Sequence, residues 1–333
     1  TWHGTPLKRM ARDQLKVVGR DEGYIERATR AAAQWSVLVS PNHFATEAIS
    51  SAFGSTAEVL EVGYPRNDML HGERAAAAAR AVRRAYSIAA DRKIVLFAPT
   101  FRDRALDRDA PVAPTAAIGL SAWLEELGEE CVLLIRRHVL DTDAAPLPEG
   151  SDGAILDVTD YPDVQELLAA ADVLVTDYSS VFFDYLNLRR PIVFFAPDVA
   201  DYGDVIRGFY LDYERDLPGP IATDPAQARE LVARALSHGT FDGYDLDVFA
   251  ERYCARDDGG AADRVVAAVF GGQERRPWPS RPQPSSSSSC RSPSRRSMSS
   301  RPGGEPSRCS RRVRCSTRGA SRSLFCSSLP PRS

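Results

Sequence analysis

The chain has 333 residues, enough for two ordinary domains that each bury a core. Its net charge of −3 at pH 7 hides an asymmetry, because residues 273–333 hold 14 Arg and 2 Glu without Lys or Asp. That stretch carries +12 and residues 1–272 carry −15. No stretch approaches the ~18 apolar residues of a membrane span, and no Walker A, GxGxxG or HExxH pattern is present.

Residues 1–72 alternate amphipathic and apolar segments. The pattern predicts helices at residues 20–33 and 42–53 and strands at 36–39 and 59–62. Two strands are too few for a complete sheet, and the chain opens on Thr1 without an initiator Met. We therefore expect the remnant of an N-terminal Rossmann-type domain that begins upstream.

Residues 73–271 follow the same pattern at full length, which predicts a second Rossmann-type domain, an α/β doubly wound parallel sheet. The apolar runs are short and nearly continuous, as expected for strands covered on both faces. The expected strands are residues 93–98, 131–136, 154–158, 173–176 and 191–195. The expected helices are residues 73–86, 120–127, 164–171, 180–188, 226–237 and 261–270.

Residues 272–333 form a low-complexity tail of Ser, Arg and Pro, with a run from Ser285 to Ser289. The tail lacks the apolar residues needed to offset ordering entropy, so we expect disorder. It is either a basic arm for phosphate-bearing surfaces or the product of translation out of frame. It holds four of the six cysteines, and the other two, Cys131 and Cys254, suit buried thiols in a reducing cytosol.

Polar clusters follow the expected strands, where ligands bind in open α/β sheets. After the strand at 173–176, the side chains of Thr176, Asp177, Ser179 and Ser180 precede an apolar helix. Hydroxyls and free N–H groups at a helix start favour phosphate. The alternative is a simple helix cap, for which Ser and Asp are common.

Two further strand ends carry cations. Arg136 and His138 follow one strand, and Pro99, Thr100 and Arg102 follow another. Arg can bind phosphate oxygens and His can transfer a proton near neutral pH. The alternative for the arginines is solvated surface charge.

The opening segment offers a fourth cluster, His3, Gly4, Thr5 and Lys8. His-Gly places an imidazole where the backbone can approach a ligand closely, and Thr5-Pro6 is typical of a helix start. No His, Asp or Glu group has ligand spacing, so we expect no metal and no cofactor. Fixed donors and Arg would stabilise charge instead.

The ordered set of these clusters resembles the family of CDP-glycerol glycerophosphotransferases, which build teichoic-acid-type polymers. The likeness covers about residues 1–265. The matching pieces begin at Trp2-His3-Gly4, Gly63-Tyr64-Pro65-Arg66-Asn67-Asp68, Ala98-Pro99-Thr100, Arg136-Arg137-His138, Asp157-Val158-Thr159-Asp160-Tyr161, Thr176-Asp177-Tyr178-Ser179-Ser180 and Arg190-Pro191-Ile192.

The resemblance implies a GT-B-like fold, with two Rossmann-type domains facing a cleft, the first of them incomplete here. It implies transfer of glycerol phosphate from CDP-glycerol to a polymer hydroxyl with release of CMP. His3 and His138 would be catalytic. The donor phosphates would be bound by Arg102, Arg136, Thr176, Asp177, Ser179 and Ser180. Pro99, Thr100, Tyr161 and Asp184 would bind nucleotide or glycerol, and Gly4, Thr5 and Lys8 would lie on the acceptor side.

The implied partners are CDP-glycerol, or CDP-ribitol as an alternative donor, and a lipid-linked polyol-phosphate or glycan acceptor, with no nucleic acid. We expect peripheral contact with the cytoplasmic face of the cell membrane, through a segment upstream of the chain. Two other interpretations stay open. One is a nucleotide-sugar glycosyltransferase or epimerase on the same architecture, and the other is a non-catalytic nucleotide-binding remnant.

Overall fold

The computed structural model describes residues 4–14, 23–100, 117–138, 146–199 and 208–271. All of them belong to one compact unit, residues 1–276. The tail at 272–333, for which we expect disorder, lies outside the described residues. Within the described part, no helix is long and apolar enough to cross a membrane.

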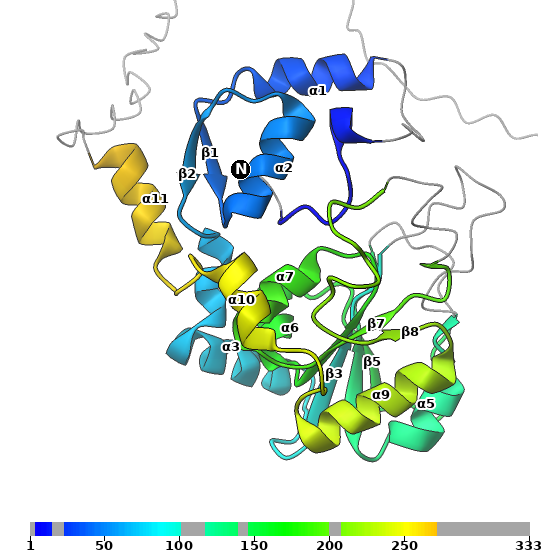
Figure 1. Ribbon diagram of the computed structural model, residues 1–333. Coiled ribbons are helices and arrows are strands. Elements are labelled where there is room, and N and C mark those ends of the chain that lie inside the picture. The colour runs from blue at the N-terminus through cyan, green and yellow to red at the C-terminus, as the bar shows by residue number, and fades with distance from the viewer. Residues whose placement is uncertain (1–3, 15–22, 101–116, 139–145, 200–207, 272–333) are drawn as a thin grey trace, which may run out of the picture. The chain divides into compact units, whose positions relative to one another are not determined.

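A six-stranded parallel sheet is the centre of the structure (Figure 1). Its spatial order is β5-β4-β3-β6-β7-β8. Because the chain runs outward from β3 in one direction and then from β6 in the other, the order reverses between these two strands, as in doubly wound folds. The prediction of a doubly wound parallel sheet is confirmed. The strands are β3 (Lys93–Phe97), β4 (Cys131–Ile135), β5 (Ile155–Asp157), β6 (Val173–Thr176), β7 (Ile192–Phe195) and β8 (Ile221–Ala222).

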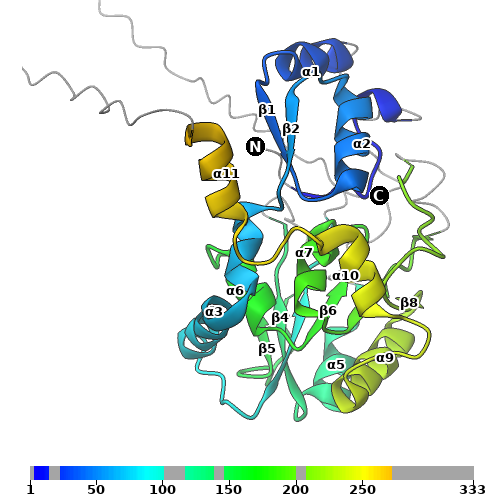
Figure 2. The ribbon, with the colours of Figure 1, turned by 60° about the vertical axis from the view of Figure 1, so that its left-hand side comes forward.

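Helices cover both faces of this sheet because its strands are apolar on both sides (Figures 1 and 2). Successive residues of β3 point to opposite faces, so Ile94 and Leu96 join one core while Val95 and Phe97 join the other. All four are completely buried. The first core is closed by α3 (Gly72–Ala85), α6 (Val164–Ala170), α7 (Val181–Tyr185) and α10 (Leu246–Cys254), and the second by α5 (Leu120–Leu127) and α9 (Pro225–His238).

The first 72 residues build a smaller sheet of two parallel strands, β1 (Val37–Ser40) and β2 (Glu58–Glu61). Their helices are α1 (Tyr24–Ala32) and α2 (His43–Phe53), with 3-10 turns at Ala11–Asp13 and Pro65–Leu70. Asn42 starts α2 by accepting a hydrogen bond from the Ala45 amide at 2.8 Å. The elements match the prediction, while the division into domains at 1–72 and 73–271 remains a prediction.

Among the described residues the final helix is α11 (Ala261–Phe270), and its first amides are bonded to a side chain from far upstream. The two carboxylate oxygens of Asp68 accept hydrogen bonds from the amides of Ala261 and Ala262, at 2.9 and 2.8 Å. The free N–H groups at the start of the helix are thereby satisfied. The segment around Asp68 is thus joined to the end of the described chain.

Three features differ from the sequence-based expectation. β8 was not predicted, because two residues are too few to show the alternation of a strand. α10 was not predicted either, because its exposed apolar residue Val248 obscures the helical spacing of its buried residues. Thr5-Pro6 does not start a helix, and the chain instead runs extended to a bridge between Lys8 and Phe209. This tertiary pairing overrides the local signal.

Candidate active site

The site lies where the strand order reverses, at the carboxyl ends of β3 and β6. The Thr176 hydroxyl donates to the Ala98 carbonyl at 2.7 Å, and the Thr100 amide donates to the Asp177 carboxylate at 2.7 Å. Thr176 and Asp177 are both completely buried. These two residues, predicted to bind phosphate, therefore join the loops that follow the two strands. Their proposed contact with a ligand remains a prediction.

A cavity of about 590 Å³ opens at this point. Its volume is typical of a site for a small molecule. It brings together predicted residues that lie far apart in the sequence, namely Gly4, Thr5, Lys8, Pro99, Thr100, His138, Ser179 and Ser180. Unpredicted residues also line it, among them Arg9, Met10, Tyr24, Phe53 and Tyr178. The cavity wall thus combines cations, hydroxyls and an exposed imidazole.

The N-terminal segment forms one wall because it is paired with a later part of the chain. The Arg9 amide donates to the Gly208 carbonyl at 3.0 Å, and the Tyr210 amide donates to the Leu7 carbonyl at 2.9 Å. The Arg9 guanidinium also donates to the Phe209 carbonyl at 3.1 Å. These contacts hold Thr5 to Lys8 at the cavity.

The turn between β6 and α7 forms the facing wall. The Ser179 hydroxyl accepts from the Val181 amide at 3.3 Å, within the turn that leads into the helix. The buried Tyr178 hydroxyl donates to Asp198 at 3.0 Å, and this bond ties the turn to the segment after β7. Gly4 is packed against this turn, since an added Cβ would lie 3.0 Å from the Ser180 Oγ. Both cavity walls are therefore in direct contact at one edge.

Arg136 and Tyr161 do not line this cavity. The Arg136 guanidinium donates to the backbone carbonyls of Val158 and Tyr161 in the loop after β5. Burial lowers the pKa of Arg136, and burial together with the Glu166 carboxylate raises the pKa of Tyr161 to about 12. In this arrangement Arg136 fixes a loop, and the predicted phosphate and nucleotide contacts of the two residues stay predictions.

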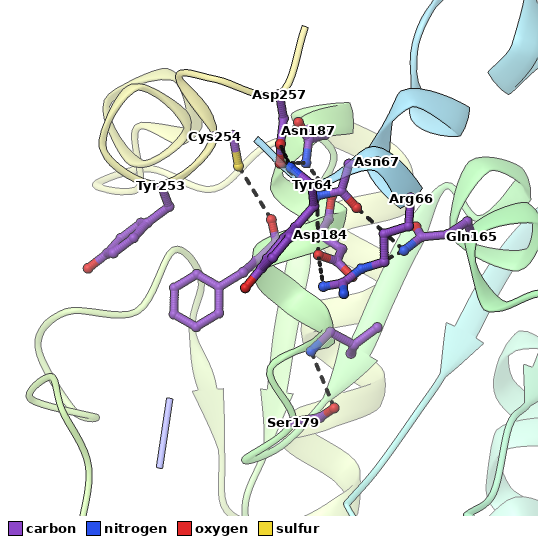
Figure 3. A network of polar contacts seen from close by, with 12 residues as sticks. Tyr64, Arg66, Asn67, Gln165, Ser179, Asp184, Asn187, Tyr253, Cys254 and Asp257 are labelled. Carbon is purple, nitrogen blue, oxygen red and sulfur yellow. Dashed lines mark hydrogen bonds and ion pairs between the residues drawn. The ribbon is translucent and has the colours of Figure 1, made fainter. Parts of the chain in front are cut away.

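Asp184 lies one turn into α7, inside a buried network that the sequence did not reveal (Figure 3). Arg66 donates to both carboxylate oxygens of Asp184, each at 2.9 Å. Gln165 and Asn67 donate to the same carboxylate at 3.2 and 3.3 Å. The Asp184 side chain is 8% exposed. Protein donors thus occupy both oxygens that we predicted to bind nucleotide or glycerol hydroxyls, so the arrangement supports a structural role for this carboxylate.

The same network reaches Asp257, near the end of the described chain. Asp257 accepts from Asn67 at 2.6 Å, from the Tyr64 amide at 2.7 Å and from Asn187 at 3.3 Å. Burial raises the pKa of Asp257 despite these donors. Gly63, at φ +87°, lets the two segments meet, because an added Cβ would lie 2.4 Å from the Arg256 carbonyl oxygen.

The Arg66 guanidinium contacts both the Asp184 carboxylate and the ring of Tyr64. It stacks over the Tyr64 ring, with its central carbon 4.4 Å from the ring centroid. Burial lowers the pKa of Arg66, but the Asp184 carboxylate together with Tyr64 and Asp257 raises it above its ordinary value. The sequence pattern contained Arg66 within Gly63-Tyr64-Pro65-Arg66-Asn67-Asp68 but gave no sign of its partner, which lies 118 residues later.

Two predicted residues, His3 and Arg102, lie outside the described residues. His3 immediately precedes Gly4, which lines the cavity. Among the residues that the structure describes, no group of three His, Cys, Asp or Glu side chains could hold a metal ion.

Known proteins resemble both the sequence and the structure. The model of the family "CDP-Glycerol:Poly(glycerophosphate) glycerophosphotransferase" matches residues 1–271. The teichoic acid poly(glycerol phosphate) polymerases of Staphylococcus epidermidis and Bacillus subtilis are 40% and 35% identical to the chain over 80% and 81% of its length. The chain spans 37% and 36% of these two relatives.

A solved structure of the wall teichoic acid polymerase TagF, soaked with CDPG, is similar with a TM-score of 0.71 and 38% identity. The match covers 81% of this chain and 67% of that one. The fold, the cavity at the reversal of strand order and the family match agree with the expected GT-B-like architecture. The chain belongs to the CDP-glycerol:poly(glycerophosphate) glycerophosphotransferase family.

Proposed function

We propose that the chain transfers glycerol phosphate from CDP-glycerol to a hydroxyl of a growing polyol-phosphate polymer or its lipid-linked primer. The observation that carries the proposal is the cavity in which Lys8, His138 and the Ser179-Ser180 turn face one another at the carboxyl ends of β3 and β6. Open α/β sheets bind nucleotides at this position. The CDPG soak of the similar TagF structure supports the choice of donor.

The reaction is a substitution at the distal phosphorus of the donor. The acceptor oxygen forms a bond to that phosphorus while the bond from the phosphorus to the bridging oxygen breaks. CMP departs with the electron pair, and the hydroxyl proton passes to a base. The protein therefore needs a base near the acceptor and positive or hydrogen-bonding groups around the pyrophosphate.

Residues of the two walls suit these separate tasks. Ser179 and Ser180 offer hydroxyls to the pyrophosphate, and His138 reaches it from the end of β4, where it can assist the departure of CMP. Lys8 and Thr5 lie on the acceptor side. His3, which precedes Gly4, is the proposed base, and Arg102 is a proposed source of positive charge for the phosphates.

The membrane setting follows from the acceptor. A nucleotide donor is supplied in the cytoplasm and the acceptor is lipid-linked, so we place the reaction at the cytoplasmic face of the membrane, with peripheral contact. CDP-ribitol remains the alternative donor.

The test incubates the 333-residue chain with a lipid-linked acceptor and CDP-glycerol, CDP-ribitol or a UDP-sugar, and measures release of CMP or UDP. We expect CMP release from CDP-glycerol. His138→Ala should lower the rate by about 100-fold or more, the range of a lost acid or base. His238→Ala is the matched control, because that exposed imidazole lies at the end of α9 and contacts the Arg234 carbonyl of its own helix.

UDP release without CMP release would contradict the proposal and favour a nucleotide-sugar enzyme. Calorimetric titration with CDP-glycerol separates binding from turnover. Binding without CMP release would instead favour a nucleotide-binding remnant.

A further inference from the structure

The segment from Gly63 to Asp68 belongs to the sequence pattern but has no place in the proposed chemistry. One of its members, Arg66, lies at the junction of the two cavity walls. An added Cβ on Gly4 would lie 3.6 Å from Arg66 Nη2 and 3.0 Å from Ser180 Oγ. Arg66 itself does not line the cavity. Its place suggests that it acts through Gly4 and α7.

Arg66 is also rigidly held, which a positioning group requires. The Nε and Nη2 atoms each donate to one oxygen of Asp184, at 2.9 Å. Such a two-point contact fixes the plane of the guanidinium as well as its distance. The ring of Tyr64 covers one face of that plane. The guanidinium therefore cannot move without breaking the pair that joins it to α7.

Three chain segments meet at this guanidinium. Asp184 belongs to the helix whose preceding turn carries Ser179 and Ser180, Arg66 belongs to the 3-10 turn at Pro65–Leu70, and Gly4 belongs to the N-terminal segment. A side chain at position 4 would press on the Ser180 hydroxyl, which would have to shift by a few tenths of an ångström. The spacing between the N-terminal segment and the β6–α7 turn is thus set by Gly4 and Arg66 together.

We infer that Arg66 is a positioning residue, which sets the N-terminal segment from Gly4 onward against the β6–α7 turn and so fixes Thr5 and Lys8 relative to Ser179 and Ser180. This inference rests on the proposed function. Loss of Arg66 should therefore leave donor binding by the β6–α7 turn nearly intact and reduce the rate of transfer.

The experiment compares Arg66→Lys and Arg66→Gln with the unmodified chain in the CMP-release assay. Lys keeps a cation beside Asp184 but lacks the planar fork, so it should preserve most of the stability and lose the positioning. We expect kcat to fall about 10-fold or more in both variants, the scale of a misplaced reacting group, while the KM for CDP-glycerol changes less than about twofold.

Two controls separate positioning from mere stabilisation. Asp68→Ala weakens the start of α11 without touching Gly4, so it should lower the urea midpoint and leave kcat unchanged. Gly4→Ala should reproduce the loss of kcat, because it displaces the same segment from the other side. If kcat follows stability equally in the Arg66 and Asp68 variants, or if Arg66→Lys keeps full kcat, the inference is wrong.

Amide hydrogen exchange tests the inference without turnover, so that its failure is distinguishable from failure of the proposed function. The Arg9 and Tyr210 amides, which pair the N-terminal segment with residues 208–210, should exchange at least about 10-fold faster in Arg66→Lys. Amides of β3 should be unaffected. Unchanged exchange at Arg9 and Tyr210 would overturn the inference even if the unmodified chain showed no CMP release.

Discussion

Two polar clusters adjoin α7, one at the turn before it and one around its residue Asp184, and their side chains have different roles. In the cavity cluster, Ser179, Ser180 and His138 turn toward an open volume of about 590 Å³. In the network around Arg66 and Asp184, the buried donors and acceptors form hydrogen bonds with one another. A cluster of polar residues can therefore bind a ligand only where its hydrogen-bonding groups line a cavity and are not all bonded to other protein groups.

The two clusters differ in how far their polar groups are removed from water. A buried carboxylate is costly unless donors surround it, so Asp184 and Asp257 each have several. The hydroxyls of the cavity cluster remain at a solvent-filled volume and carry no such cost. Changes in the network should therefore affect stability, with an added effect on the rate at Arg66 because it lies beside Gly4, whereas changes in the cavity cluster should affect activity.

The largest expected effect is that of Asp184→Ala. This change leaves the Arg66 cation without its carboxylate, and removing one partner of a buried pair costs about 3–5 kcal/mol. We expect the lower end, about 3 kcal/mol, because the Arg66 side chain keeps 29% exposure. Urea denaturation measures it. Asp247→Ala, which breaks an exposed pair with Arg189, is the control and should cost under about 1 kcal/mol.

Ser180→Ala should have the next largest effect, on activity alone. A hydrogen bond to a charged group contributes about 1.5–3 kcal/mol, so kcat/KM for CDP-glycerol should fall about 10- to 100-fold. The urea midpoint should not change. Ser237→Ala on α9, whose exposed hydroxyl donates to the Ala233 carbonyl of its own helix, is the matched control. A stability loss with full activity would place Ser180 in the network instead.

Asp68→Ala should have a smaller effect, again on stability. It removes the acceptor for the amides of Ala261 and Ala262, and loss of such a cap costs about 1 kcal/mol. Asp263 is an exposed acid in the first turn of α11, and Asp263→Ala should lower the free energy of unfolding by only about 0.3 kcal/mol. Equal midpoints for the two variants would show that Asp68 does not hold α11.

The smallest expected effect is a pH dependence from Asp257. Burial raises the pKa of this carboxyl in the folded protein above its ordinary 3.8. At pH values between 3.8 and the raised pKa, the folded state binds more protons than the unfolded state. The contribution of Asp257 to stability therefore falls as pH rises through this range and is constant above it. Urea midpoints across this range should show the fall in the unmodified chain and lack it in Asp257→Asn. An identical pH profile for both proteins would contradict the raised pKa.

Much of the fold was predictable because its signals are local. A strand buried on both faces must be a short apolar run, so β3, β4, β6 and β7 were found within one or two residues of their bounds. The strand ends that carry Thr100, His138 and Ser180 followed directly. β8 escaped because two residues carry no periodicity.

The site was predictable only in part, since pattern alone does not tell which polar group faces a ligand. Arg136 and His138 stand two residues apart at one strand end, yet the first is bonded to backbone carbonyls and the second lines the cavity. Arg9 and Tyr178 also line it, although only their neighbours in the same segments were predicted to be site residues.

The sequence by itself determined the doubly wound sheet and the polar residues at its strand ends, because both depend on hydrophobic order along the chain. Only the tertiary structure decided which of these residues share a cavity and which pair with one another. Arg66 and Asp184 are 118 residues apart, and Asp68 meets Ala261 across 193. No local pattern encodes such pairs, because they form only when the packed chain brings the partners together and removes the water between them.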